Sequence, residues 1–199
     1  LGVFRSLVDH EDADPEIKAI FLQAISDLAA AGAIIVDPLE IKDFQILSNQ
    51  IPFCGRFRYD VGQYFKSLEN PPLLDVNKVL ETGEIAPETR ASFAFYAQNP
   101  LDVVPDEWEV PCPTWPNHPE RNQLLANAIE AMDAAEVDAL IFPTWSNPPA
   151  HIELANEEYR GDNNQRLTPD AGLPAVTIPM AFWQNKLPAG LQFVGRPYA

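Results

Sequence analysis

The sequence predicts an α/β fold, in which part of a mixed, largely parallel β-sheet is covered by helices. Two sections of the chain combine helical periodicity with short apolar strands, and two further strands lie close together near the C-terminus. The apolar runs are nearly unbroken, which is typical of strands covered on both faces in a parallel sheet. With 199 residues, 46% of them apolar, the chain is long enough for one sizeable core.

The first section predicts a strand, a helix and a second strand. Leu1–Arg5 is the first strand; Asp14 then caps a helix that has Pro15 at its first position. Apolar residues recur along this helix at helical spacing, at Ile17, Ile20, Phe21, Ala24, Ile25 and Leu28. Gly32 ends the helix, and Ala33–Val36 is the next strand. The section therefore predicts a βαβ unit with a right-handed crossover.

The second section predicts another helix and strand, followed by a hairpin. Pro119 begins the helix, and Asp138–Phe142 is a buried strand that Pro143 ends. The apolar stripe of this helix consists of Leu124, Leu125, Ala128, Ile129 and Met132. Ala175–Ile178 and Gly190–Val194 then predict an antiparallel hairpin on the mixed sheet.

Residues 44–116 are expected to form an irregular helical layer. Helical patches at Tyr59–Leu68, Val76–Glu81 and Pro87–Gln98 are separated by prolines and aromatic residues. No internal boundary is evident, so residues 1–199 are expected to form a single domain. Because the chain begins without Met, on what looks like a strand already inside a domain, we expect that domain to be incomplete.

The charge of the chain argues against two classes of partner. Its 29 acidic residues outnumber 13 basic ones, which gives a formal charge of -16. This charge repels phosphate backbones and anionic lipid surfaces, so neither nucleic acid nor a membrane is an expected partner. Solubility is the simpler explanation of the excess of acidic residues.

The two cysteines give no pattern of a crosslinked or zinc-binding fold. Cys54 and Cys112 lie far apart and form no CxxC pair, so each is expected to be an ordinary buried or free thiol. Two unpaired thiols favour a reduced, cytoplasmic compartment as the default.

No set of residues in the sequence predicts a catalytic site. A Gly-x-Ser-x-Gly elbow is absent, and His10, His118 and His151 lie in loops without a carboxylate partner on a shared helix face. The acidic residues between Asp9 and Asp14 lack the central glycine and terminal glutamate of an EF-hand loop. No glycine-rich phosphate loop occurs. We therefore expect no catalytic residue, metal or cofactor.

Four motifs follow one another between residues 138 and 197. They are a buried strand ending in Pro-Thr (DALIFPT), an Asn-bearing loop (GDNNQRLTP), a Gly-x-Pro-Ala strand entry (GLPAVTIPM) and a hairpin (LPAGLQFVGRP). Each is weak alone, whereas four in this order are specific. The succession resembles the C-terminal region of the amidase-signature family. The resemblance spans nearly the whole chain and is faintest over residues 44–116.

The resemblance implies that the catalytic residues lie elsewhere. Members of this family hydrolyse amide bonds with a Ser–cis-Ser–Lys triad, which the resemblance places upstream of this chain. The sequence has no Ser-Ser pair, and its five lysines lie on predicted helices or loops. We therefore expect a fragment that lacks the N-terminal catalytic part and the extreme C-terminus. Alone it should be inactive, and it should be poorly soluble or self-associate, because the sheet edge and apolar surface that the missing part would cover are exposed.

Candidate substrate-binding residues follow the strand at 138–142. Thr144, Trp145, Ser146 and Asn147 lie at its carboxyl end, where α/β sheets generally place their binding crevice. Trp145 forms either an apolar wall for an acyl or aromatic group or a cap on the core. Asn164 either orders its own loop or lines the pocket mouth.

The expected function is thus that of the C-terminal segment of an amidase that hydrolyses a small-molecule amide. Two alternatives remain: a non-catalytic α/β module that binds a small molecule or a subunit, and a fragment of an amidotransferase A-type subunit. The compact Gly-Asp-Asn-Asn loop and the Gly-Arg-Pro ending favour a stand-alone amidase. The sequence predicts neither the particular amide nor the oligomeric state.

Overall fold

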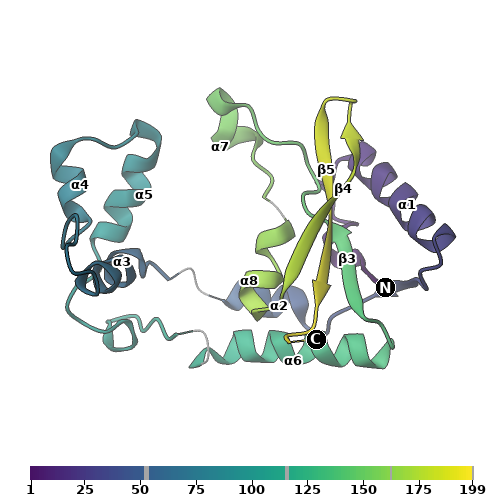
Figure 1. The fold of residues 1–199 in the computed structure, drawn as a ribbon, viewed down its shortest axis with the longest axis horizontal. Helices are drawn as coiled ribbons and strands as arrows, with labels where there is room; N and C mark the ends of the chain where they lie inside the picture. The colour runs from purple at the N-terminus through teal and green to yellow at the C-terminus, as the bar shows by residue number, and fades with distance from the viewer. Residues whose placement is uncertain (52–53, 115–116, 162, 199) are drawn as a thin grey trace. The chain divides into compact units, whose positions relative to one another are not determined.

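The computed structural model describes residues 1–51, 54–114, 117–161 and 163–198 (Figure 1). The predicted irregular layer includes Pro52, Phe53, Trp115 and Pro116, and the predicted Asn-bearing loop includes Asp162; these lie outside the described residues. The chain divides into two compact units. The sheet unit comprises Leu1–Ile51 and Pro119–Ala199, and the helical unit comprises Pro52–His118.

The sheet unit contains a mixed five-stranded sheet with the order β2-β1-β3-β5-β4. The strands are β1 (Gly2–Phe4), β2 (Val36–Leu39), β3 (Ala139–Pro143), β4 (Ala175–Trp183) and β5 (Leu187–Gly195). β1 pairs in parallel with both β2 and β3, whereas β5 pairs antiparallel with β3 and β4. The predicted mixed sheet and its C-terminal hairpin are therefore confirmed.

Two long helices and several short ones flank this sheet. The long helices are α1 (Pro15–Ala30) and α6 (Pro119–Ala134). The short elements are α2 (Phe44–Gln50), α7 (Ala155–Glu158), α8 (Thr168–Ala171), η1 (Arg5–Leu7), η4 (Ile152–Leu154) and η5 (Asn163–Gln165). In Figure 1, α1 lies on one side of the strands, while α2 and α8 lie on the other side next to α6.

The predicted helix start at Asp14 is confirmed at atomic detail. Asp14 Oδ1 accepts hydrogen bonds from the backbone N–H of Glu16 at 2.8 Å and of Ile17 at 3.0 Å. These bonds satisfy donors that the first helical turn leaves free. Gly32 follows the helix with φ +100°, a backbone angle that residues with a side chain rarely adopt.

The core of the sheet unit is apolar and includes three packed aromatic rings. Phe4 of β1 meets Phe44 edge to face at 4.8 Å between ring centroids and Phe142 at 6.3 Å. Leu124, Ala128 and Met132, from the predicted stripe of α6, are fully buried against the same cluster. This core fixes β3, and with it the segment that follows β3.

The strand predicted at Ala33–Val36 is displaced along the chain. The observed strand is Val36–Leu39, and the side chain of Ile34 is 83% exposed. Asp37 and Pro38 of this strand are exposed and only Leu39 is buried, so its two faces are not both covered as the apolar sequence suggested. β2 is also an edge strand of the described sheet. An edge position also tolerates Pro38, which has no N–H to donate to a neighbouring strand.

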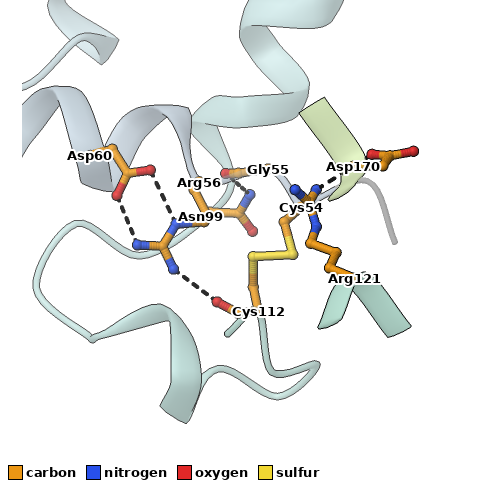
Figure 2. The surroundings of a disulfide bond; sticks show 8 residues. All are labelled: Cys54, Gly55, Arg56, Asp60, Asn99, Cys112, Arg121 and Asp170. Carbon is orange, nitrogen blue, oxygen red and sulfur yellow. Dashed lines mark hydrogen bonds and ion pairs between the residues drawn. A yellow bond between two sulfur atoms is a disulfide. The ribbon is translucent and has the colours of Figure 1, made fainter. Parts of the chain in front are cut away.

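The helical unit is built from α3 (Phe57–Lys66), α4 (Asn77–Thr82), α5 (Pro87–Ala97) and the short η2 (Pro105–Glu107). The three helical patches expected from the sequence are confirmed. The expectation of two separate thiols is wrong, because Cys54 and Cys112 form a disulfide (Figure 2). Their Cα atoms are 5.8 Å apart although the residues are 58 positions apart in sequence. Only the fold brings them together, so spacing could not reveal the pair.

Candidate substrate pocket

The segment after β3 runs beside the β4–β5 hairpin. The backbone N–H of Thr144 donates to Gly190 O at 2.8 Å, which continues the pairing between β3 and β5 by one residue. The carbonyl of Thr144 accepts from the backbone N–H groups of Asn163, at 3.0 Å, and Asn164, at 3.2 Å. The Pro-Thr ending of the strand motif is thereby tied both to the hairpin motif and to the Asn-bearing loop.

An apolar pocket of about 470 Å³ lies between this segment, α1 and the hairpin. It is lined by Ile17, Thr144, Trp145, Asn147, Pro148, Pro149, Thr177, Ile178, Pro179, Trp183, Leu187, Pro188, Ala189 and Gly190. No charged residue is among these described lining residues. The volume is that of a small-molecule site, and an apolar wall with a few polar groups is the usual composition of such sites.

Two threonines and a glycine form one wall of the apolar pocket. The Thr144 and Thr177 hydroxyl oxygens are 3.1 Å apart, within hydrogen-bonding distance. A Cβ at Gly190 would lie 2.7 Å from Thr177 Cγ2 and 2.9 Å from Thr144 Oγ1. Glycine in the hairpin motif thus lets both threonines approach the strand. Any larger residue would displace them.

A buried polar cluster holds the segment in place. Asn163 Nδ2 lies 2.7 Å from Leu7 O, 2.9 Å from Pro143 O and 2.6 Å from Ser146 Oγ, and it donates to these acceptors. Ser146 Oγ itself donates to Leu7 O at 3.1 Å. Both side chains are buried. Removal of Asn163 would take a donor from Pro143 O and Ser146 Oγ, whereas Leu7 O would keep the one from Ser146; the loss of a buried hydrogen bond is costly in a protein interior.

The five residues predicted to bind substrate occupy three different settings. Thr144, Trp145 and Asn147 line the apolar pocket, whereas Ser146 does not: it lines a separate polar cavity, and its hydroxyl is already bonded. Asn164 does not line the pocket; besides its N–H to Thr144, its carbonyl accepts from Thr168 Oγ1 at 2.7 Å.

Two side chains on the pocket wall have distinctive surroundings. The half-buried Trp145 ring packs edge-on against Tyr159, with centroids 6.0 Å apart. Asn147 Nδ2 is covered by neighbouring atoms and has no acceptor among the described residues. Because this donor is covered, an acceptor on a ligand could reach it only if the side chain turned toward the pocket.

Sequence reasoning missed Asn163, the buried anchor of the loop. The two adjacent asparagines are indistinguishable by type, and nothing in the spacing says which one points inward. Neither Ser146 nor Asn163 alone predicts a buried contact. Both are small hydrogen-bonding residues in or beside the family-like motifs, and only the fold shows that they bond to each other.

A charged cavity of about 640 Å³ adjoins the apolar pocket and shares Asn147, Pro148, Pro149, Trp183 and Leu187 with it. Its other lining residues are Asp14, His151, Glu158, Arg160, Gln184 and Lys186. The Glu158 carboxylate lies 2.7 Å from His151 Nδ1, and this hydrogen bond raises the pKa of His151. A ligand in the apolar pocket would therefore have charged groups near one end.

A polar cavity of about 230 Å³ lies on the other side of Asn147 and is lined in part by His10, Asp12 and Arg166. Burial, and then the positive charge of Lys18, lower the pKa of His10, so its imidazole is neutral at neutral pH. No serine or threonine hydroxyl is hydrogen-bonded to His10 in the described structure. The geometry therefore offers no activated nucleophile at this cavity.

Neither a metal site nor a membrane helix is found in the described parts of the chain. No group of three or more His, Cys, Asp or Glu side chains there is placed to hold a metal ion. No helix there is both long and apolar enough to cross a membrane.

Comparison with solved structures places the chain among amidase folds. The native peptide amidase from Stenotrophomonas maltophilia superposes with a TM-score of 0.64 at 20% sequence identity, over 99% of this chain and 39% of that one. An amidase family protein from Bacillus anthracis superposes with a TM-score of 0.60 at 20% identity, over 98% of this chain and 34% of that one.

Similar curated proteins are A-type subunits of glutamyl-tRNA(Gln) amidotransferase. That of Synechococcus sp. (strain CC9311) is 26% identical over 208 residues, which cover 98% of this chain and 41% of that protein. The mitochondrial protein of Homo sapiens is 37% identical over 82 residues, which cover 38% of this chain and 16% of that protein. The chain thus spans less than half the length of these relatives. The family model described as Amidase matches residues 1–199, and the chain belongs to the amidase family.

Proposed function

We propose that this chain forms one wall of the substrate pocket in an amidase that hydrolyses a carbon–nitrogen amide bond. The observation that carries the proposal is the apolar pocket, which lies at the carboxyl end of β3 and is lined by the hairpin of the family-like motifs. Thr144, Trp145 and Asn147 are the proposed substrate-binding side chains. Ser146 and Asn164 hold the loops that carry them.

The residues that cleave the bond belong, in this proposal, to another part of the same domain. Ser146 donates to a backbone carbonyl and has no basic partner among the described residues, so it is not an activated nucleophile. These 199 residues would then supply sheet, helical cover and pocket wall, and would be inactive alone.

The exposed edge of strand β4 supports the proposal that the domain is incomplete. β4 is at the edge of the described sheet and exposes apolar side chains, with Val176 58% and Phe182 60% accessible. A strand that is paired on one side alone and exposes apolar residues is unusual in a finished fold, because its other edge offers a template for pairing. We propose that further chain of the same domain covers this edge.

Substitution of Trp145 tests the pocket. In the native protein that carries this chain, Trp145→Ala should raise KM for an aromatic amide by about tenfold with a smaller change in kcat, since it removes binding area and not the chemistry. Trp145→Phe should retain most of the affinity. Trp108→Ala, a matched change in the helical unit, should leave KM unchanged. Equal KM values for the Trp145→Ala and wild-type enzymes would refute a substrate-binding wall here.

An amidotransferase is the second candidate function. The names of the curated relatives favour it, one of them over 98% of this chain. The uncharged lining of the apolar pocket favours a neutral group there, because a buried charge needs a partner, and a charged end of the substrate would have to lie toward the adjoining charged cavity. Stable co-purification of the native protein with other protein chains would favour the amidotransferase. Turnover of simple amides by a single purified chain would favour the stand-alone amidase.

A further inference from the structure

The helical unit contains very little buried apolar surface of its own. Among its described residues, 54–114 and 117–118, the buried apolar side chains are those of Val76, Pro105 and Cys112. Several large apolar side chains are instead open to solvent, including Tyr64 and Leu74, each 61% exposed, and Phe95, 52% exposed. Domains of fewer than about 80 residues with so small a core commonly need a covalent staple or a metal.

The disulfide lies where a staple would be most effective. Cys54 and Cys112 lie near the two ends of the unit, so the bond closes nearly the whole of it into one loop. Closing a loop of this length removes a large share of the conformational freedom of the unfolded chain. Cys112 is only 3% exposed and is the more buried cysteine of the pair.

Polar contacts gather around the bond. Figure 2 shows Arg56 between Cys112 and Asp60: its guanidinium donates to Cys112 O at 2.8 Å and to both Asp60 carboxylate oxygens, at 3.0 and 3.1 Å. Asn99 Nδ2 donates to Gly55 O at 2.8 Å, next to Cys54. The segment around Cys54 and the segment around Cys112 are therefore each hydrogen-bonded to other parts of the unit near the disulfide.

Other long-range contacts of the unit join α3 to α5. Phe57 packs against the rings of Phe93 and Tyr96, with centroids 5.3 and 5.6 Å apart, and Arg58 makes several of the polar contacts. Arg58 pairs with both oxygens of Asp75, at 2.7 and 3.1 Å, and donates to the carbonyls of Ala97 and Asn99. It thus connects α3 to the turn before α4 and to the end of α5. These groups are partly exposed, and exposed ion pairs contribute little to stability. They position the helices but do not replace a core.

We propose that the helical unit is ordered only while the Cys54–Cys112 disulfide is intact, and that the protein consequently acquires its fold in an oxidising compartment. The two thiols lose two electrons and two protons to a partner disulfide, which is reduced to two thiols as the Cys54–Cys112 bond forms. The prediction of a cytoplasmic compartment is based on two unpaired cysteines. Because Cys54 and Cys112 form a disulfide, that prediction loses its basis.

Amide hydrogen exchange of the native protein, purified without reductant, tests the proposal. Dithiothreitol should accelerate exchange in α3, α4 and α5 by roughly 30-fold or more, as expected for the loss of a long-loop disulfide. Exchange in β3 and α6 of the sheet unit should change little. The variant with both Cys54→Ser and Cys112→Ser should show the fast exchange without reductant and no further response to it.

Two controls keep the outcome decisive. Alkylation of the native protein before any reduction should leave both cysteines unmodified, and modification of either would overturn the proposal. Unchanged exchange in α3 to α5 after complete reduction would also overturn it. So would an equal loss of protection in both units, because the dependence would then not be confined to the helical unit.

Discussion

The sheet unit and the helical unit are stabilised by different means. In the sheet unit, Phe4, Phe142 and Met132 are fully buried, and backbone pairing in five strands surrounds them. In the helical unit the corresponding contacts are a disulfide, the hydrogen bonds of two arginines and the partly exposed rings of Phe57, Phe93 and Tyr96. The comparison teaches that aromatic content alone does not indicate a core, because the described Phe and Tyr side chains of the helical unit are half-buried or exposed, and none is fully buried.

Truncation of a matched pair of phenylalanines should separate the two units most clearly. Phe142→Ala should lower the free energy of unfolding by about 3–5 kcal/mol, since the ring is completely buried and contacts Phe4. Phe95→Ala, at a half-exposed position, should cost less than about 1 kcal/mol. Urea unfolding of both variants measures the difference. Similar losses for the two would show that the helical unit has a core of its own.

Acid should weaken the helical unit through Asp75. The hydrogen bonds from Arg58 lower the pKa of the Asp75 carboxyl, so the folded state favours the charged form. That contribution is present above the ordinary aspartate pKa and is lost as the pH falls below about 4, through the lowered pKa. We expect a loss of at most about 1 kcal/mol, because solvent screens the partly exposed pair.

Asp75→Asn tests this dependence. The variant should exchange amide hydrogens in α3 and α5 faster at neutral pH and should respond less to acid than the wild type. Asp102→Asn is the matched control, since Asp102 is largely exposed and lies 3.4 Å from Lys66 Nζ. If Asp75→Asn and the wild type weaken in parallel on acidification, Asp75 is not the group that titrates.

The parts of the fold that local rules determine could be predicted from the sequence. The cap at Asp14, the stripe of α6 and the β4–β5 hairpin all follow from residue types and spacing. The displaced β2 could not be predicted in the same way, since an apolar run such as Ala33-Ile34-Ile35 does not show which of its residues join the sheet or whether another layer packs on them. Burial of a strand depends on its place in the sheet.

The candidate site was predictable in position and less so in detail. The carboxyl end of β3 is where the sheet rule places a crevice, and Thr144, Trp145 and Asn147 do line one. The side chains of Ser146 and Asn163 are buried because both donate hydrogen bonds to the carbonyl of Leu7. Leu7 is more than a hundred positions away in sequence, so the sequence does not show that Asn163, and not Asn164, is the buried residue. The disulfide has the same origin, a tertiary approach of two distant segments.

Amide turnover by purified residues 1–199, compared with turnover by the native protein that carries them, tests the central claim most directly. If this chain is a pocket wall without a nucleophile, the native protein should hydrolyse an aromatic amide while the isolated chain should not, even when hydrogen exchange shows that its β3 and α6 are folded. Hydrolysis by the isolated chain, at a rate abolished by substitution of a residue within it, would contradict the account.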